Sequence, residues 1–164
     1  MNITSQQDSN RPTQVIGWRE WVGLPELGIH QLKAKVDTGA RTSALHAFSV
    51  ETFENDAGIR CVRFGVHPDQ RSLERELYCE APILDERVVR DSGGHAEQRF
   101  VIRTQLTMGA LALPIDLTLT ARDDMLFRML LGRTAMSGLF TVDPSRSYLI
   151  GKKKRKKHHN NESD

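Results

Sequence analysis

The stretch Lys35-Val-Asp-Thr-Gly-Ala-Arg-Thr-Ser-Ala-Leu45 decides the fold of this 164-residue chain. The residues just before it, 31–36, have an uneven apolar pattern that is weakly typical of a strand. The chain then turns at Gly39, since glycine tolerates backbone angles that a side chain forbids. Asp37 therefore sits on a tight turn, near backbone N–H groups that can bond its carboxylate. Asp-Thr-Gly is also a common turn capped by its own Asp and Thr side chains, so the tripeptide alone leaves two interpretations open.

A second segment, late in the chain, is apolar and ends in Gly-Arg. It reads Met129-Leu-Leu-Gly-Arg133, and Thr134-Ala-Met136 follows it. An early Asp-Thr-Gly-Ala with a late apolar Gly-Arg segment resembles the retropepsin-like aspartic peptidases. In that family the second segment lies beside the catalytic turn and leads into a short helix.

Four motifs in order along the chain narrow this resemblance. They are residues 35–46, Arg99-Phe-Val-Ile102, Leu130-Leu-Gly-Arg-Thr-Ala-Met136 and Val142-Asp-Pro-Ser-Arg-Ser-Tyr-Leu149. Together they are similar to a small bacterial retropepsin-like group, which is often catalogued as "ATP-dependent zinc protease" and is found beside RimK-type glutamate ligases. The resemblance covers Val15 to Gly151.

The resemblance implies an all-β fold: a closed acid-protease barrel with a flap hairpin, one short helix near the C-terminus, and a homodimeric assembly. Many short strands punctuated by Gly, Pro, Asn and Asp independently favour a barrel or sandwich over alternating βαβ units. We expect a disordered leader over 1–14, one peptidase domain over 15–151 and a basic disordered tail over 152–164. Strands are expected over 15–22, 29–36, 59–66, 74–80, 87–90, 98–103, 106–112, 115–120 and 148–150.

The catalytic residues implied by the resemblance are Asp37, Thr38 and Gly39. An aspartic peptidase needs two carboxylates that face one water and share a proton. Asp91-Ser92-Gly93 superficially repeats the motif, but Arg90 precedes it where Val36 precedes Asp37. We therefore interpret residues 91–95 as the tip of the flap hairpin. The second carboxylate must then be the Asp37 of a second copy, related by a two-fold axis.

Further site residues follow from the resemblance. Those expected to bind substrate are Ala40, Arg41, Asp91, Ser92, Gly93, Gly94 and Arg99, and those expected to support the turn are Leu131, Gly132 and Arg133. Viral retropepsins carry an acidic residue at the position of Arg41, and it pairs with the arginine of the Gly-Arg segment. Here Arg133 must find another carboxylate or serve another role. Arg41 itself either grips a substrate carboxylate or pairs with an internal Asp or Glu, and both interpretations stay open.

Charge is unevenly distributed along the chain. Six of the 23 basic residues lie in Lys152 to Lys157 and two of the 21 acidic residues lie beyond them, so residues 1–151 carry a net charge of −2. The body therefore gives no indication of a nucleic-acid-binding face. The basic run is interpreted as a solvated tail or as a weak contact with RNA or the ribosome.

No cofactor or metal is expected. The chain has no His-Glu-x-x-His and no phosphate-binding Gly-x-x-x-x-Gly-Lys, and its His and Cys residues lack ligand spacing. Without a secretory signal or an apolar run long enough to span a bilayer, the expected compartment is the cytoplasm. Cys61 and Cys79 need not pair there.

Two functions from different classes compete. The first is a homodimeric aspartic endopeptidase acting on a peptide or protein, with a glutamate-rich tail such as that of a glutamate-tailed ribosomal protein as the expected substrate. The second is a non-catalytic dimeric peptide-binding module of the same fold. A zinc-dependent hydrolase is a distant third.

Overall fold

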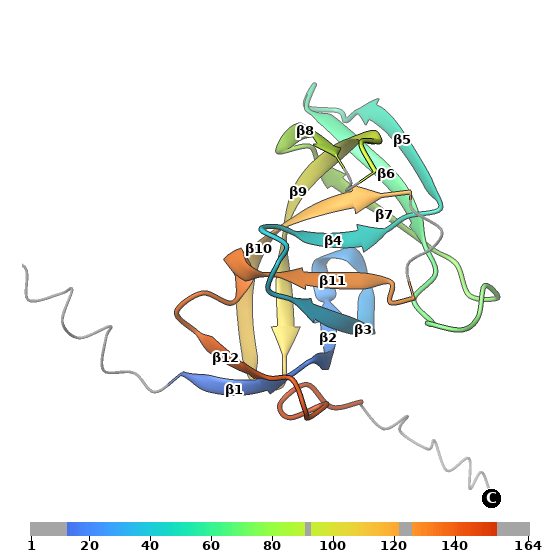
Figure 1. The fold of residues 1–164 in the computed structure, drawn as a ribbon. Helices are drawn as coiled ribbons and strands as arrows, with labels where there is room; N and C mark the ends of the chain where they lie inside the picture. The colour runs from blue at the N-terminus through green and yellow to red at the C-terminus, as the bar shows by residue number, and fades with distance from the viewer. Residues whose placement is uncertain (1–12, 91–92, 122–125, 154–164) are drawn as a thin grey trace, which may run out of the picture.

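The computed structural model describes residues 13–90, 93–121 and 126–153, and these form an all-β structure (Figure 1). The strands are β1 (Gln14–Gly17), β2 (Arg19–Leu24), β3 (Ile29–Asp37), β4 (Ser43–His46), β5 (Ser49–Glu54), β6 (Arg60–Val66), β7 (Leu77–Pro82), β8 (Asp85–Arg90), β9 (Ala96–Met108), β10 (Leu111–Thr120), β11 (Met129–Gly132) and β12 (Phe140–Asp143). Two single 3₁₀ turns, η2 (Pro25–Leu27) and η3 (Arg133–Ala135), interrupt them. Neither is long enough to cross a membrane, and no other helix occurs in the described residues.

The largest sheet has seven strands in the order β10-β4-β11-β3-β2-β9-β8. Strand β10 also pairs with β9 through a long antiparallel ladder, so the hydrogen-bonded order returns to the strand on which it began. Strands β5, β6 and β7 form a separate three-stranded sheet, and β1 pairs with β12 in parallel. Sequentially distant strands therefore lie side by side in the centre of the molecule, as β3, β4 and β11 do in Figure 1.

Alternation along β3 shows how the sequence selects this arrangement. Leu32, Ala34 and Val36 are buried, whereas Lys33 and Lys35 on the intervening positions are not. Successive side chains of a strand point to opposite faces, so the apolar set lines the core and the lysines face outward. The core that these strands enclose is built mainly from aliphatic residues, with Phe64 as its largest fully buried side chain.

Several strand predictions hold and three are wrong. β3, β6 and the β8–β9 hairpin lie where they are expected, and the strand expected over 74–80 is β7, at the edge of its sheet. Residues 15–22 are not one strand, because the chain breaks at Trp18 into β1 and β2, which belong to different sheets. Residues 106–112 are not one strand, because Gly109 takes a left-handed φ of 59° and turns the chain from β9 into β10. Residues 148–150 are not a strand either. The expected helix after Gly132 is the single 3₁₀ turn η3.

A buried carboxylate holds the 148–150 segment in place of a strand partner. Glu20 on β2 is fully buried. Its carboxylate accepts hydrogen bonds from the N–H groups of Leu149 (2.8 Å), Ile150 (2.7 Å) and Gly151 (3.3 Å). The Trp21 N–H donates back to the Gly151 carbonyl at 3.1 Å. We call these contacts the Glu20 latch: they supply the partners that a buried charge requires.

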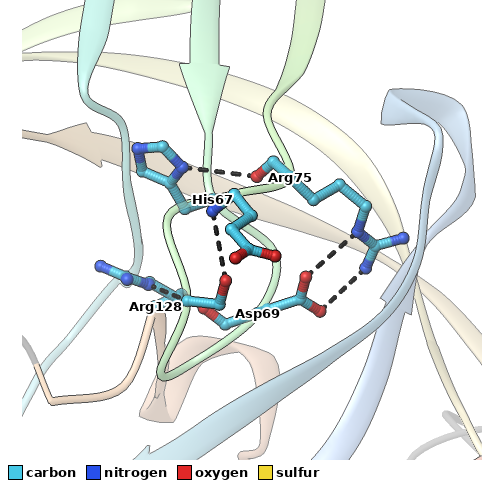
Figure 2. Close-up of polar contacts among 6 residues, drawn as sticks. His67, Asp69, Arg75 and Arg128 are labelled. Atoms are coloured by element: carbon cyan, nitrogen blue, oxygen red, sulfur yellow. Dashed lines mark hydrogen bonds and ion pairs between the residues drawn. The ribbon is translucent and has the colours of Figure 1, made fainter.

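The connection between β6 and β7 is also shaped by polar contacts (Figure 2). The Arg75 guanidinium donates to both carboxylate oxygens of Asp69, at 3.0 and 3.2 Å. The His67 ring nitrogen Nδ1 lies 3.4 Å from the Arg75 carbonyl, and Arg128 Nε donates to the Asp69 carbonyl at 3.5 Å. The two arginines therefore approach Asp69 from different segments and fix the course of this loop.

The Glu20 latch predicts a large stability difference between two glutamate substitutions. Glu20→Ala leaves three N–H groups of the buried or half-buried residues 149–151 without this acceptor, so the free energy of unfolding should fall by about 2–4 kcal/mol. Glu26→Ala, at an exposed position of η2, is the matched control and should stay within about 0.5 kcal/mol of the parent. Urea unfolding measures both. Equal stabilities for the two variants would contradict the assignment of the latch as a major contributor.

Candidate active site

Asp37 is the last residue of β3, and its carboxylate is held by the turn that follows. The Gly39 N–H donates to Asp37 Oδ1 at 3.1 Å, and the Ala40 N–H donates to the Asp37 carbonyl at 3.2 Å. A Cβ on residue 39 would lie 3.3 Å from the same Oδ1, so glycine gives the carboxylate its room. Asp37 is partly exposed, while Thr38 and Gly39 are exposed. The turn thus presents a fixed carboxylate to solvent.

The Gly-Arg segment lies directly beside this turn. Strand β11 runs parallel to β3, with Leu131 opposite Val36 and Gly132 opposite Asp37. A Cβ on Gly132 would lie 2.5 Å from the Thr42 carbonyl carbon, so only glycine permits this approach. The Gly132 N–H also donates to Ser43 Oγ at 3.0 Å. Leu131 is fully buried and anchors the strand in the core.

Arg133 donates hydrogen bonds to the backbone carbonyls of the Asp37 turn. Its N–H donates to the Ala40 carbonyl at 2.8 Å, and its Nη1 donates to the carbonyls of Thr38 (3.4 Å) and Gly39 (3.3 Å). Within the described residues it forms no ion pair. Arg133, whose role the sequence left open, therefore braces the Asp37 turn through backbone carbonyls.

A cleft of about 420 Å³ opens beside Asp37. One wall comes from the turn and β4, and the other comes from the β8–β9 hairpin and the end of β10. Its lining residues are Asp37, Ala40, Thr42, Ala44, Val89, Arg90, His95, Glu97, Arg99, Thr120, Ala121 and Leu130. Of the residues expected to bind substrate, Ala40 and Arg99 thus lie in the same cleft as Asp37.

The other expected substrate-binding residues lie elsewhere. Arg41 is exposed, outside the lining of the cleft, and has no carboxylate partner within the described residues. Gly93 and Gly94 are exposed at the end of the hairpin and do not line the cleft. Asp91 and Ser92 lie outside the described residues.

Glu97 is a cleft residue that sequence reasoning missed. Its carboxylate accepts hydrogen bonds from Thr120 Oγ1 (3.0 Å) and the Ala121 N–H (2.9 Å), and it forms an ion pair with Arg99 Nε at 2.9 Å. Partial burial raises the pKa of Glu97, but the bonds from Ala121, Arg99 and Thr120 together outweigh it and lower the pKa overall. The only signal in the sequence is that Glu97 and Arg99 sit two apart on one strand and so share a face.

No group of three or more His, Cys, Asp or Glu side chains in the described residues is placed to hold an ion. Cys61 and Cys79 are both buried and unpaired as thiols, and burial raises the pKa of Cys79 to about 11.

A family model described as RimB-like, "Retropepsin-like aspartic endopeptidase RimB", matches residues 15–153. The chain belongs to this family. A solved structure from Legionella pneumophila, the protein Lpg0085 described as having unknown function (DUF785), superposes with a TM-score of 0.69 at 26% identity, covering 84% of this chain and 98% of that one.

Curated relatives that are longer than this chain also match it. A "Probable alpha-L-glutamate ligase" of Parasynechococcus marenigrum is 47% identical over 137 residues, which is 84% of this chain and 29% of the relative. A protein of the same name from Desulfotalea psychrophila is 45% identical over 141 residues, 84% of this chain and 30% of the relative. The chain therefore spans just under a third of the length of these curated relatives.

The approach of Gly132 predicts a strong effect of a single methyl group. Gly132→Ala places a Cβ inside the contact distance of the Thr42–Ser43 backbone, so β11 must shift and the free energy of unfolding should fall by about 2–3 kcal/mol. Gly138→Ala is the control: it adds a methyl in open space at a φ of 79°, and should cost about 1 kcal/mol. Thermal or urea unfolding measures both, and a smaller loss for Gly132→Ala than for the control would refute the steric argument.

The lowered pKa of Glu97 predicts a pH-dependent contribution to stability. Its ionised form is favoured in the folded protein, so the contribution is complete above the unfolded-state pKa of about 4.3 and is lost as pH falls through the lower folded-state pKa. The stability difference between the parent and Glu97→Gln should therefore be constant from about pH 7 to 5 and shrink on acidification below about pH 4. Denaturant unfolding across this range measures it. If the stability difference between the parent and Glu97→Gln instead grew on acidification, the pKa of Glu97 would be raised, not lowered, by folding.

Proposed function

We propose that this protein is an aspartic endopeptidase whose catalytic water lies between two Asp37 carboxylates, one from each protomer of a symmetric homodimer. Membership of the RimB-like family supports the reaction class. The observation that carries the proposal is the position of the carboxylate of Asp37, the first residue of the family's Asp-Thr-Gly-Ala motif. This carboxylate is held by the Gly39 N–H and is open to the cleft. The ring of strands formed by the β9–β10 pairing corresponds, in this proposal, to the closed barrel of the acid proteases.

The second carboxylate is assigned to another protomer because the cleft's own candidate is already engaged. Among the described residues, Glu97 is the other acidic residue that lines the cleft, and three donors lower its pKa. A carboxylate held in its ionised form by such donors is poorly suited to share a proton with Asp37. A two-fold axis beside the Asp37 turn supplies an identical carboxylate instead. Thr38, exposed next to Asp37, would then meet its counterpart across that axis.

The chemistry requires the pair to hold one proton. Two carboxylates about 3 Å apart cannot both ionise, so one takes a proton from the water and the other gives one to the substrate carbonyl oxygen. The water then adds to the peptide carbon, and collapse of the tetrahedral intermediate releases the amine. Arg133 and Gly132 do not take part in the proton transfers; they keep the turn, and therefore Asp37, in place.

The proposed substrate is an acidic, glutamate-rich peptide or protein tail in the cytoplasm, with a glutamate-tailed ribosomal protein as one example. Arg90 lines the cleft opposite the turn and favours carboxylates over basic side chains, while Arg99 in the same wall is paired with Glu97. The name of the longer relatives, "Probable alpha-L-glutamate ligase", points to the same amino acid. Arg41, exposed and without a described carboxylate partner, adds positive charge next to the turn.

A second candidate function is a non-catalytic peptide-binding module of the same fold. It is favoured by the fact that the matched region is less than a third of relatives named as ligases, where such a module could hold the acidic peptide. Turnover separates the two functions.

Asp37→Asn tests the proposal. The variant should lose several orders of magnitude in kcat/KM on a glutamate-rich peptide while keeping its fold, because the dyad can no longer activate water. Asp116→Asn, which removes a carboxylate paired with Arg103 away from the cleft, is the control and should retain activity. Specific activity of the parent should fall on dilution below the dimer dissociation constant. Full activity in Asp37→Asn would exclude the aspartic mechanism, and no turnover by the parent would favour the binding module.

A further inference from the structure

A second hollow lies outside the cleft, over the outward faces of β2 and β3 and the 67–75 loop. Its volume is about 480 Å³. The charged and aromatic residues that line it are Trp21, Lys33, Asp69, Arg71, Arg75 and Lys153. We call it the basic groove. None of these residues lines the cleft beside Asp37.

The groove carries an excess of positive charge. Four cations face one carboxylate, Asp69, which is already paired with Arg75 at 3.0 Å (Figure 2). Lys33, Arg71 and Lys153 have no carboxylate partner within the described residues. A concave surface with unpaired cations concentrates anions, and ammonium and guanidinium donors both suit carboxylates.

Trp21 helps to decide which anion the groove accepts. The ammonium nitrogens of Lys33 and Lys153 lie 5.2 and 5.8 Å from its ring centroid, and the Tyr148 ring stacks on it at 6.1 Å. Binding of single-stranded nucleic acid uses aromatic faces that are open to the bases. Here the indole is already engaged by two cations and a ring, so the groove offers charge without a stacking platform. A carboxylate-rich peptide fits this chemistry better than RNA.

Strand β3 connects the groove to the catalytic turn. Lys33, Lys35 and Asp37 occupy alternate positions, so they lie along one face, while the residues between them are buried. At about 3.3 Å per residue, Lys33 is roughly 13 Å from Asp37 along the strand, which is the length of about four extended residues. Lys35 is exposed midway, so a peptide following β3 would meet a cation before it reaches the groove.

We propose that the basic groove is an exosite: it binds an extended, carboxylate-rich part of the substrate about four or more residues from the bond held at Asp37. The consequence for hydrolysis rests on the proposed function, whereas binding in the groove can be measured without it. The exosite would make capture depend on the length of the acidic segment, since a peptide too short to span β3 reaches only one of the two sites.

Binding is tested in the Asp37→Asn protein, which holds peptide without cleaving it. The probes are fluorescent peptides of about ten glutamates, of about ten glutamines and of four glutamates, followed by anisotropy. Lys33→Gln/Arg71→Gln should weaken binding of the long glutamate peptide by at least about tenfold, while binding of the four-residue peptide changes less than about twofold. As a single substitution, Lys33→Arg should keep most of the affinity for the long glutamate peptide, because it keeps the charge. Lys153→Gln, also made alone, should weaken binding of that peptide.

The matched control is Arg63→Gln, which removes a cation that lies over Tyr78 outside the groove. An equal loss in this control would show that only net charge matters and would overturn the exosite, as would failure of the long glutamate peptide to bind. Tighter binding of a ten-nucleotide single-stranded RNA at the same residues would overturn the choice of ligand. In the parent enzyme, the double variant should lower kcat/KM for long but not for short peptides. If the parent cleaves nothing yet the binding results hold, the proposed function fails and the binding site stands.

Discussion

The position of Asp37 depends on one close backbone approach, that of Gly132 to residues 42 and 43. It lets β11 lie parallel to β3 and antiparallel to β4, so one short strand joins the two ends of the loop that carries the carboxylate. The Gly132 N–H then donates to Ser43 Oγ, and the Arg133 N–H donates to the Ala40 carbonyl. Closure of this loop is thereby built into the sheet.

The charged side chains around the cleft differ in how fully they are engaged by hydrogen bonds and ion pairs. Glu97 and Arg99 neutralise each other and tie the β8–β9 hairpin to the end of β10. Asp37 accepts one bond from the turn and is otherwise directed to the cleft. Donors around a carboxylate favour its ionised form, which is why those around Glu97 lower its pKa.

Local sequence predicted much of the fold and part of the site. The Asp-Thr-Gly turn, β3 and the β8–β9 hairpin carry local signals, namely a glycine turn, an uneven apolar pattern weakly typical of a strand, and a glycine-containing loop. The 148–150 segment looked like a strand because it is apolar, yet its backbone bonds go to a glutamate some 130 positions away, and no local pattern encodes such a contact. Glu97 was missed for the same reason, since its donors Thr120 and Ala121 come from another strand. Arg133 was found by resemblance, but its carbonyl partners became visible only in three dimensions.

The Glu20 latch also constrains the timing of folding during synthesis. Glu20 is made early, but its three donors belong to residues 149–151. While the ribosome is still making the strands between them, the carboxylate has no partner and must stay hydrated, which keeps β2 from burying its inner face. Domains acquire their stability as units once their last element is available. The first strands of this domain therefore cannot settle in the core until residue 151 has left the exit tunnel, so nascent chains arrested earlier should be open to proteases and chaperones.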